Sequence, residues 1–384
     1  MVYLLKLGEL TLKGENRGGF EKILKRNLKA LLKGVPSKIS VTNGRYFVDV
    51  PEEYAEQAES AFSRLFGISG WALTRVYEKT VDAVLAGCVE EARVLERKGI
   101  KTFKIEARRT DKSFPLDSYG IMAEAGGVVL ENAPSLKVNV KTPQAVITVE
   151  IREQAYIYSA SVKGLRGLPV GVAGRGLLLL SGGIDSPVAG FLMAGRGMSI
   201  DAVHFHAYPF TSEEAQKKVA ELAEILGRYA MGVRLHVVRF TEVEMRIKDR
   251  APHPWATVLL RMAMMKAAEE IAVECGAKCL ITGESLSQVA SQTVENIACA
   301  QSVVTLPVFR PLIGMDKEAI TRIAEEIGTY KTSILPYEDC CTLFSPKHPV
   351  LRGNIKEALE LFRHSLLEYF TTGVVRRDDP LPLT

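Results

Sequence analysis

A short loop between an apolar strand and a helix start constrains the fold of this 384-residue chain more than any other feature. Residues 177–180 are four consecutive leucines, and residues 181–186 then read SGGIDS. Pro187 follows where a helix can begin, because the first helical residue needs no backbone N–H donor. A strand, a tight loop and a helix in this order predict the first unit of a parallel α/β sheet.

The loop itself is suited to hold a pyrophosphate group. Gly182 and Gly183 let backbone N–H groups approach an anion, and the following helix contributes the positive end of its dipole. The hydroxyl groups of Ser181 and Ser186 add donors, and the Asp185 carboxylate would help to hold Mg²⁺ beside the phosphates. The loop lacks the lysine of the Walker phosphate loop, which disfavours transfer of a γ-phosphate.

The rest of the second half of the chain alternates strands with helices. Strands are expected at residues 201–206, 234–238 and 279–282, and helices at 187–196, 213–229 and 355–369, before a polar tail. This alternation predicts a doubly wound parallel sheet, covered by helices on both faces, over residues 166–384.

The first half of the chain predicts two smaller α/β units, followed by a glycine-rich linker at residues 164–176. The first unit, placed at residues 1–55, has the order strand, helix, strand, strand, helix of a ferredoxin-like unit. Residues 70–77 offer the further strand that this unit needs. The second unit, placed at residues 56–165, combines two helices with four strands.

The first half is also basic, which favours a polyanionic partner. Residues 1–169 hold 26 lysines and arginines against 20 acidic residues. Within residues 98–114, cations interleaved with Phe103 and Phe114 suit phosphate contacts and base stacking on single-stranded nucleic acid. The alternative is an edge strand protected by lysines. The candidate RNA-binding residues are Lys101, Lys104, Arg108, Arg109, Lys112 and Phe114.

Composition excludes several other classes of protein. With 47% hydrophobic and 24% charged residues, the chain is too apolar for a disordered protein. Its six cysteines lack the spacing of a disulfide framework, so we expect reduced thiols and a cytoplasmic protein. No apolar run approaches the roughly 18 residues of a membrane span, and no signal peptide is evident.

Several motifs together carry a family resemblance. Residues 177–190 resemble the PP-loop of the ATP pyrophosphatase superfamily, whose members cleave ATP between the α and β phosphates and attach AMP to a substrate oxygen. The further motifs are KLGELTLKGENR (6–17), HFHAYPF (204–210), GESLSQVASQT (283–293), RPLIGMDK (310–317) and PYEDCCT (336–342). With a basic middle domain like the THUMP RNA-binding module, they resemble the tRNA 4-thiouridine synthetase, or tRNA sulfurtransferase (ThiI), family over nearly the whole chain.

This resemblance implies a fold, a reaction and partners. The fold is a ferredoxin-like domain, a THUMP domain and a PP-loop ATP pyrophosphatase domain. The reaction is ATP-dependent adenylation of O4 of the uridine at position 8 of tRNA and its replacement by sulfur, with Mg²⁺ accompanying ATP. A cysteine desulfurase is expected as persulfide donor, and a homodimer as the assembly.

The resemblance also assigns residues. The expected nucleotide-binding residues are Leu179, Leu180, Ser181, Gly182, Gly183, Ile184, Asp185, Ser186, His204, Phe205, Arg261, Gly283 and Gln292. The expected catalytic residues are Asp185, Lys317 and Cys341. Lys317 matches a lysine that the family needs for catalysis, and Cys341, rather than Cys340, matches the cysteine that helps to release sulfur. A cysteine near a cation or a helix start would have a lowered pKa and be reactive. The alternatives are an exposed lysine and two buried structural cysteines.

Other interpretations stay open at this point. Arg261 lies in an apolar helical segment, where it meets an anionic partner or reaches the surface. His204 and His206 can be packed histidines, and no metal site is predicted because no third ligand is evident.

One departure from the family pattern affects the route of sulfur. Many members continue into a rhodanese domain that carries the persulfide, whereas this chain ends at Thr384. That leaves the sulfur route and any role in thiamine biosynthesis open. Two other functions also stay open: a PP-loop enzyme that modifies another RNA base, and an RNA-binding scaffold with a vestigial PP-loop.

Overall fold

The computed structural model describes residues 1–12, 17–42, 45–337, 346–372 and 377–381 of the chain. These residues form two compact units, Met1–Gly167 and Leu168–Thr384, so the division falls within the expected glycine-rich linker. Each unit has its own sheet and its own hydrophobic core. In the described part of the chain, no helix has the length and hydropathy needed to cross a membrane.

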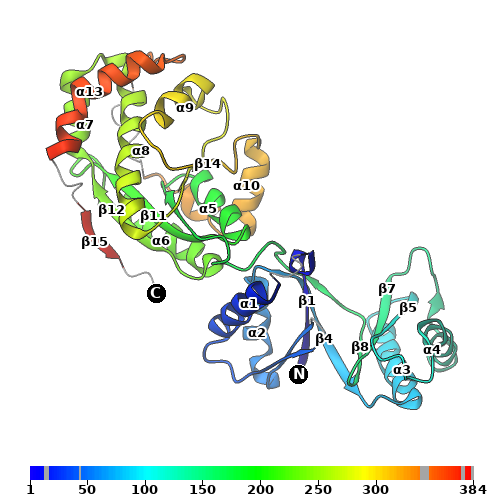
Figure 1. Ribbon diagram of the computed structural model, residues 1–384. Coiled ribbons are helices and arrows are strands. Elements are labelled where there is room, and N and C mark those ends of the chain that lie inside the picture. Colours follow the sequence, from blue (N-terminus) through cyan, green and yellow to red (C-terminus); the bar gives the residue numbers. More distant parts are fainter. Residues whose placement is uncertain (13–16, 43–44, 338–345, 373–376, 382–384) are drawn as a thin grey trace. The chain divides into compact units, whose positions relative to one another are not determined.

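The first unit begins with a ferredoxin-like arrangement, as predicted (Figure 1). Its elements are β1 (Val2–Leu7), α1 (Arg17–Leu31), β2 (Lys38–Thr42), β3 (Arg45–Asp49), α2 (Ala55–Ser63) and β4 (Ile68–Tyr77), with 3-10 turns at Glu9–Leu12 and Glu52–Tyr54. The strands are antiparallel in the order β2-β3-β1-β4. Leu24 and Leu28 of α1 share one core with Phe62 of α2 and Trp71 of β4. A boundary after residue 55 would therefore cut through a packed core.

The remainder of the first unit is a second α/β arrangement. Its elements are α3 (Val81–Arg97), β5 (Thr102–Arg109), α4 (Ser118–Asn132), β6 (Lys137–Val138), β7 (Ala145–Ile151), β8 (Ala155–Tyr158) and β9 (Val162–Lys163). Strand β5 runs parallel to β7, and β7 runs antiparallel to β8. Because β4 pairs with β1 and also with β8, a single nine-stranded sheet joins the two parts.

The second unit is the predicted doubly wound sheet, with the strand order β14-β13-β10-β11-β12-β15. Every neighbouring pair is parallel except β12 and β15. The strands are β10 (Arg175–Leu179), β11 (Ser199–His206), β12 (Arg234–Arg239), β13 (Leu280–Ile281), β14 (Val308–Phe309) and β15 (Arg377–Leu381). The helices are α5 (Asp185–Gly195), α6 (Glu213–Ala230), α7 (Thr241–Arg250), α8 (Ala256–Cys275), α9 (Val294–Gln301), α10 (Lys317–Glu326), α11 (Tyr330–Ser333) and α13 (Ile355–Thr372), with 3-10 turns at His253–Trp255 and Ala290–Gln292.

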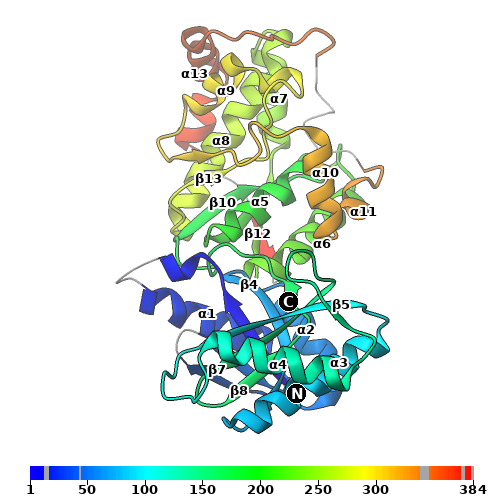
Figure 2. The same cartoon turned by 90° about the vertical axis from the view of Figure 1, so that its right-hand side faces the viewer.

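Helices cover both faces of this sheet (Figure 2). Helix α8 is apolar on most of its surface and is buried against Leu177 of β10 and Val203 of β11, together with parts of α7, α9 and α13. On the other face, α5 packs closely on β10 and α6. A Cβ atom at Gly190 would lie 2.7 Å from side-chain carbons of both Leu178 and Leu226. Tight packing of α5 fixes the position of the loop that precedes it.

The C-terminal strand β15 differs from the polar tail that was expected. It pairs antiparallel with β12, with Val238 opposite Arg377. Residues 377–381 read RDDPL, which has no strand-like hydrophobic pattern. The open edge of β12 offers backbone partners irrespective of side-chain pattern, and an edge strand tolerates a proline.

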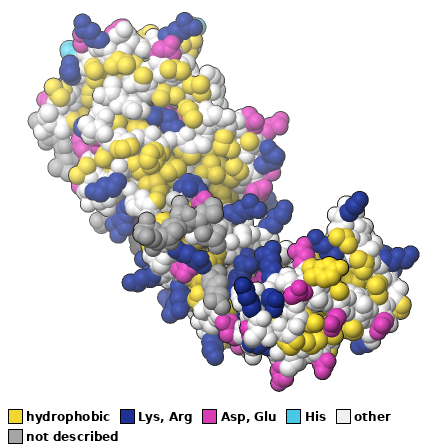
Figure 3. Space-filling model, turned by 45° about the vertical axis from the view of Figure 1, so that its right-hand side comes forward, with side chains coloured by type: hydrophobic (Ala, Val, Ile, Leu, Met, Phe, Trp, Pro, Cys, Tyr) yellow, Lys and Arg dark blue, Asp and Glu magenta, His cyan; other side chains and the backbone are white. Residues whose placement is uncertain are grey.

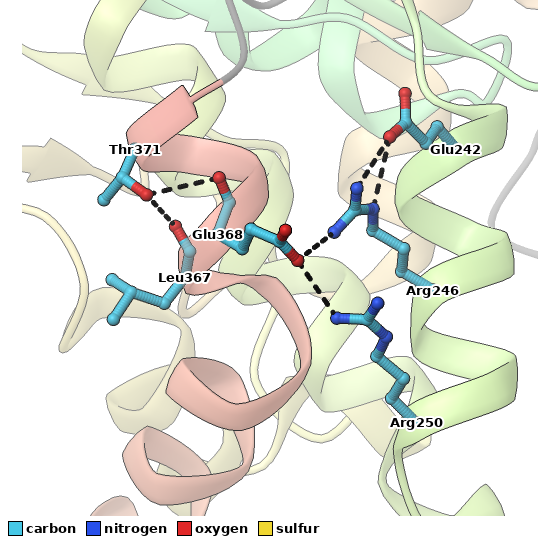
Figure 4. A network of polar contacts seen from close by, with 6 residues as sticks. All are labelled: Glu242, Arg246, Arg250, Leu367, Glu368 and Thr371. Carbon is cyan, nitrogen blue, oxygen red and sulfur yellow. Dashed lines mark hydrogen bonds and ion pairs between the residues drawn. The ribbon is translucent and has the colours of Figure 1, made fainter.

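A network of polar contacts links α7 to α13 (Figure 4). Glu368 of α13 accepts hydrogen bonds from Arg246 (3.2 Å) and Arg250 (3.3 Å) of α7. Arg246 is also paired with Glu242 one turn earlier. The hydrogen bonds from Arg246 and Arg250 lower the pKa of Glu368. Because these side chains lie at the surface, the network orients α13 on α7 more than it stabilises the fold.

Candidate nucleotide-binding and catalytic site

The predicted phosphate loop connects the carboxyl end of β10 to α5 and is braced by its own serines. The backbone N–H of Ser181 donates to the Ser186 hydroxyl (2.9 Å), and that of Gly183 donates to the Ser181 hydroxyl (3.3 Å). The two hydroxyl oxygens lie 3.1 Å apart. We had expected these hydroxyls as donors to an anion, but they also hold the loop in shape, which leaves the start of α5 as the main group that can face an anion.

Gly283 lets the end of β13 touch the phosphate loop. A Cβ atom at this position would lie 2.7 Å from the backbone nitrogen of Ser186 and 2.9 Å from the Asp185 carbonyl carbon. Those distances are far below van der Waals contact, and the atoms are backbone atoms that cannot turn aside. A glycine is therefore needed here for close approach of two backbones, a role that the sequence assigned only through a motif.

Most of the residues that were assigned to nucleotide binding line one cavity. It lies at the carboxyl ends of β10, β11 and β13, where an open α/β sheet binds ligands. Of the predicted set, Gly182 and Ile184 are absent from its lining, and Ile184 is instead the N-cap of α5. The lining residues are Leu179, Leu180, Ser181, Gly183, Asp185, Ser186, Val203, His204, Phe205, Arg261, Met264, Thr282, Gly283, Glu284 and Gln292.

His204 has a structural contact inside this cavity. Its side chain is buried, and its Nδ1 lies 3.2 Å from the carbonyl oxygen of Leu180, to which it can donate a hydrogen bond. This contact ties the end of β11 to the start of the phosphate loop. His206 is also buried. The interpretation of both as packed histidines fits these positions.

A buried carboxylate that the sequence analysis missed organises the cavity wall. Glu284, 3% exposed, accepts hydrogen bonds from Arg261 of α8 (2.5 Å), Arg310 after β14 (2.7 Å) and Thr282 (2.9 Å). Arg261 therefore has an anionic partner and does not simply reach the surface. The sequence offered one signal for this ion pair. Glu284 follows an apolar strand and a glycine, and Arg261 lies in an apolar helix, so each charged residue would need a partner if it were buried.

The charge of Glu284 is fixed by its two arginines. Burial alone would raise the pKa of this carboxyl group, but the charges of Arg261 and Arg310 and their hydrogen bonds outweigh burial and lower the pKa to about 2. The cluster therefore holds one negative and two positive charges at neutral pH. The excess of one positive charge faces a cavity suited to phosphates.

The two residues assigned to catalysis meet at the open side of the cavity. The Lys317 ammonium group lies 2.5 Å from one carboxylate oxygen of Asp185, and the Gln288 amide donates to the other (2.9 Å). Asp316 caps α10 by accepting a hydrogen bond from the backbone N–H of Ala319, which places Lys317 at the first position of that helix. Residues distant in sequence, 185, 288 and 317, thus form one polar group.

The cysteine pair assigned to sulfur transfer, Cys340 and Cys341, lies outside the described residues. The described cysteines are free thiols. Burial raises the pKa of Cys88 to about 12 and that of Cys279 to about 11, and it also raises the pKa of Cys275. These thiols are therefore protonated at neutral pH and are poor nucleophiles.

Three side chains at the opposite edge of the sheet have donor atoms suited to a metal ion. Ligand atoms of Asp201, His236 and Cys275 all lie within 4.8 Å of one another. Asp201 is already paired with Arg175 at 3.1 Å, and the same guanidinium donates to the Cys275 carbonyl oxygen. This cation supplies the counter-charge that a metal would bring. The cluster was not predicted, because its members are scattered over three elements.

The predicted RNA-binding stretch needs correction. Phe114 and Phe103 are buried in the core beneath α3 and α4, so neither can stack on a base. Lys104 is paired with Glu106 at 2.6 Å. Arg109 donates to the carbonyl oxygens of Lys112 and Phe114 and shapes the turn after β5. The aromatic residues were misassigned because period-two alternation in β5 turns Phe103 to the core. Of the predicted RNA-binding cations, Lys101, Arg108 and Lys112 are exposed.

Arg108 lines a hollow in the first unit that sequence spacing could not reveal. Lys6 of β1 and Arg45 of β3 line it too, together with the carboxylates of Glu106 and Glu150. Burial would raise the pKa of Glu150, but the nearby charge of Arg45, with Arg152, outweighs burial and lowers it. Three cations from three strands thus line one small hollow. Such a group of cations is a suitable place for a phosphate.

The fold and this cavity define a doubly wound α/β protein of the PP-loop type, preceded by a ferredoxin-like and a further α/β part. Three family models match the chain in the same order: the ThiI ferredoxin-like domain at residues 2–72, the THUMP domain at 78–160 and the thiamine biosynthesis protein (ThiI) model at 171–365. The chain belongs to the ThiI family. The first two matches divide at the end of β4, beyond the boundary at residue 55 that we expected.

Similar proteins agree with this assignment along the whole chain. A probable tRNA sulfurtransferase of Treponema pallidum (strain Nichols) is 50% identical over 95% of this chain and 92% of its own length. One from Acetivibrio thermocellus is 43% identical over 100% and 99%. Among solved structures, a 4-thiouridine synthetase in complex with RNA and bound ATP has a TM-score of 0.87 and 36% identity, covering 98% of this chain and 99% of that one.

Replacing Gly283 should weaken nucleotide binding. In Gly283→Ala the new methyl group would push against the phosphate-loop backbone, so we expect the Kd for ATP, measured by calorimetry, to rise roughly tenfold. Gly314→Ala is the matched control, because a Cβ atom at that position would meet no described part of the chain within 4 Å. Equal affinities of the two variants would contradict the close-approach role of Gly283.

Replacing Glu284 by glutamine should destabilise the second unit. Glu284→Gln keeps the shape but leaves two arginines without their counter-charge, at a cost on the order of 3 kcal/mol in the free energy of unfolding. Urea unfolding would measure this, with the exposed Glu295→Gln as control.

The same variant tests the pKa of Glu284. Its folded-state pKa of about 2 lies below the unfolded value of about 4.3, so its stabilising contribution is complete above pH 4.3 and is lost as the pH falls towards 2. The stability difference between wild type and Glu284→Gln should shrink over that interval. A difference independent of pH would show that Glu284 is not ionised in the folded protein.

Proposed function

We propose that this protein is a tRNA sulfurtransferase that converts the uridine at position 8 of tRNA to 4-thiouridine. The observation that supports this most is the cavity in which the phosphate loop, Arg261 and the Asp185–Lys317 pair meet. The similar proteins named tRNA sulfurtransferase and the RNA-bound 4-thiouridine synthetase support the substrate class. A tRNA substrate supports a cytoplasmic location for the proposed reaction.

In the first proposed step ATP activates the base. O4 of the uridine forms a bond to the α-phosphorus of ATP, pyrophosphate leaves, and the N3 proton of the base is lost to solvent until the thiolated base takes one up again. The start of α5 and the glycine-containing loop that precedes it are the proposed site for the phosphates. Arg261, held in place by Glu284, adds a cation at the cavity wall. Lys317, paired with Asp185 of the phosphate loop, is the proposed cation for the negative charge that develops on the leaving pyrophosphate.

In the second proposed step sulfur replaces the activated oxygen. The terminal sulfur of a persulfide forms a bond to C4, and AMP leaves with the former O4. The thiolate of Cys341 then breaks the sulfur–sulfur bond and forms a disulfide, which an external thiol must reduce before the next cycle. A cysteine desulfurase is the proposed source of the persulfide, and we also propose a homodimer.

Mg²⁺ fits this site as a companion of ATP. The ion is usually held by one or two carboxylates together with phosphate oxygens, and Asp185 supplies one carboxylate at the phosphate loop, 19% exposed. Bound there, Mg²⁺ would neutralise phosphate charge. Release of Asp185 from Lys317 would free the lysine for the phosphates.

The reaction and two of its residues can be tested together. An unmodified tRNA transcript is incubated with the protein, ATP, Mg²⁺, cysteine and a cysteine desulfurase, and its nucleosides are analysed by mass spectrometry. Wild type should give 4-thiouridine at position 8, and Asp185→Ala and Cys341→Ser should reduce it by on the order of 100-fold or more. Cys275→Ser, remote from the phosphate loop, is the control and should stay active.

Three outcomes would contradict parts of this proposal. Absence of product with the wild type, while tRNA still binds, would favour a scaffold or a different substrate base. Loss of tRNA binding in Asp185→Ala would show that the phosphate loop, and not only the first unit, is needed to bind tRNA, which the proposal does not expect. Full activity of Cys341→Ser would remove that cysteine from the chemistry.

The hollow lined by Arg108 should contribute to tRNA binding. Arg108→Glu reverses a charge beside Lys6 and Arg45, so we expect weaker binding of tRNA and a salt dependence (log Kd against log salt) reduced by about 1. Fluorescence anisotropy over a salt series would measure both. Arg93→Glu, the same change on the exposed surface of α3, is the control. If both variants weakened tRNA binding equally, the net charge of the first unit, and not the hollow, would determine the affinity for tRNA.

A further inference from the structure

Four aliphatic side chains are exposed on the loops beside the phosphate loop. They are Leu286 (44% exposed), Val289 (53%), Ile313 (38%) and Ile334 (55%), here called the apolar rim. Single exposed aliphatic residues are common on protein surfaces, whereas a group of them at one place marks a binding surface. Figure 3 shows that hydrophobic side chains are gathered on one face of the second unit.

Hydrogen bonds place one side of the apolar rim next to the catalytic pair. The backbone N–H of Leu286 donates to the carbonyl oxygen of Ile313 (3.1 Å), so the loops after β13 and β14 lie side by side. Gln288, between Leu286 and Val289 in the chain, donates to Asp185 (2.9 Å). Three members of the rim therefore flank the carboxylate at the open side of the cavity.

The fourth member approaches the phosphate loop from another element. Ser333, at the end of α11, donates from its hydroxyl to the carbonyl oxygen of Gly183 (3.4 Å), and Ile334 is the next residue. Two separate segments that contact the phosphate loop thus carry exposed aliphatic side chains. This arrangement is decided by tertiary contacts, because the four residues spread over 49 positions of the sequence.

We propose that the apolar rim receives the target pyrimidine base after it has left the stack of the RNA, and holds its carbonyl group at the phosphate loop. This inference rests on the proposed function. An enzyme that modifies a base inside folded RNA must extrude it, and the extruded ring is then held between apolar or aromatic side chains. A neutral heterocycle suits a rim of uncharged groups whose charged neighbours, Asp185 and Lys317, are paired with each other.

The position of the rim favours a base as its occupant. A pyrimidine ring is of the size of one or two aliphatic side chains. The loop that carries Leu286 and Val289 also supplies Gln292 to the lining of the cavity, so an occupant of the rim lies next to the proposed phosphate site.

The test uses the whole protein and a tRNA transcript with a fluorescent pyrimidine analogue at position 8, whose emission rises when the base leaves the stack. Wild type with ATP and Mg²⁺ should raise the emission. Leu286→Ser and Val289→Ser should each weaken this response, with the equilibrium for base capture shifted roughly tenfold. Val289→Ile, which keeps an apolar side chain, should retain it, and so should the control Val273→Ser at the far end of α8, where the side chain is 66% exposed.

Binding of tRNA by anisotropy and of ATP by calorimetry should stay within about twofold in the rim variants, since most contacts to tRNA are made to its backbone and no rim residue lines the cavity proposed for ATP. An unchanged emission response in Leu286→Ser and Val289→Ser would overturn the proposal. It would also be overturned if the variants lost thiolation only with the desulfurase and kept it with free sulfide, because the rim would then dock a protein donor. If the wild type gave the emission response but formed no 4-thiouridine on an unmodified transcript, the proposed function would be refuted. Capture of the base by the rim would still be supported.

Discussion

The ion pairs of one buried carboxylate, Glu284, hold the cavity of the second unit together. They join the loop after β13 to α8 through Arg261 and to the segment after β14 through Arg310. In a low-dielectric interior such a cluster is stable only when every member is paired, since an unpaired buried charge is costly. Arg261, which lines the cavity, is therefore oriented before any ligand arrives, and such preorganisation lowers the entropy cost of binding.

Other charged groups near the Glu284 cluster are paired with each other in a way that allows a bound phosphate to replace one partner of a pair. Asp185 is held by Lys317 and Gln288, and the phosphate loop is shaped by its own serines. A ligand that carries phosphate and a cation can exchange partners with the Asp185–Lys317 pair without leaving either charge unpaired. The same logic holds in the first unit, where Arg45 balances the buried Glu150 while Arg108 stays exposed in the hollow.

Much of the fold followed from the sequence, and the exceptions have physical reasons. The doubly wound sheet and the ferredoxin-like unit were predicted from strand, loop and helix signals, and the family resemblance assigned most of the residues that line the cavity. Phe114 was misassigned because an aromatic residue in a basic stretch can face the core as easily as the solvent. Strand β15 was missed because its pairing uses only the open edge of β12. Glu284 was missed because its partners lie 23 residues before and 26 residues after it.

The sequence by itself determined the phosphate loop, since four leucines, two glycines and a helix start encode a strand, a turn and an anion-binding helix end through local interactions. The family motifs then predicted which other residues bind the nucleotide together with that loop. Tertiary structure alone decided which distant groups meet there: Lys317 beside Asp185, Arg261 against Glu284, and the apolar rim around them. The physical reason is that parallel strands bring their carboxyl ends to one edge of the sheet, whatever their separation in the chain.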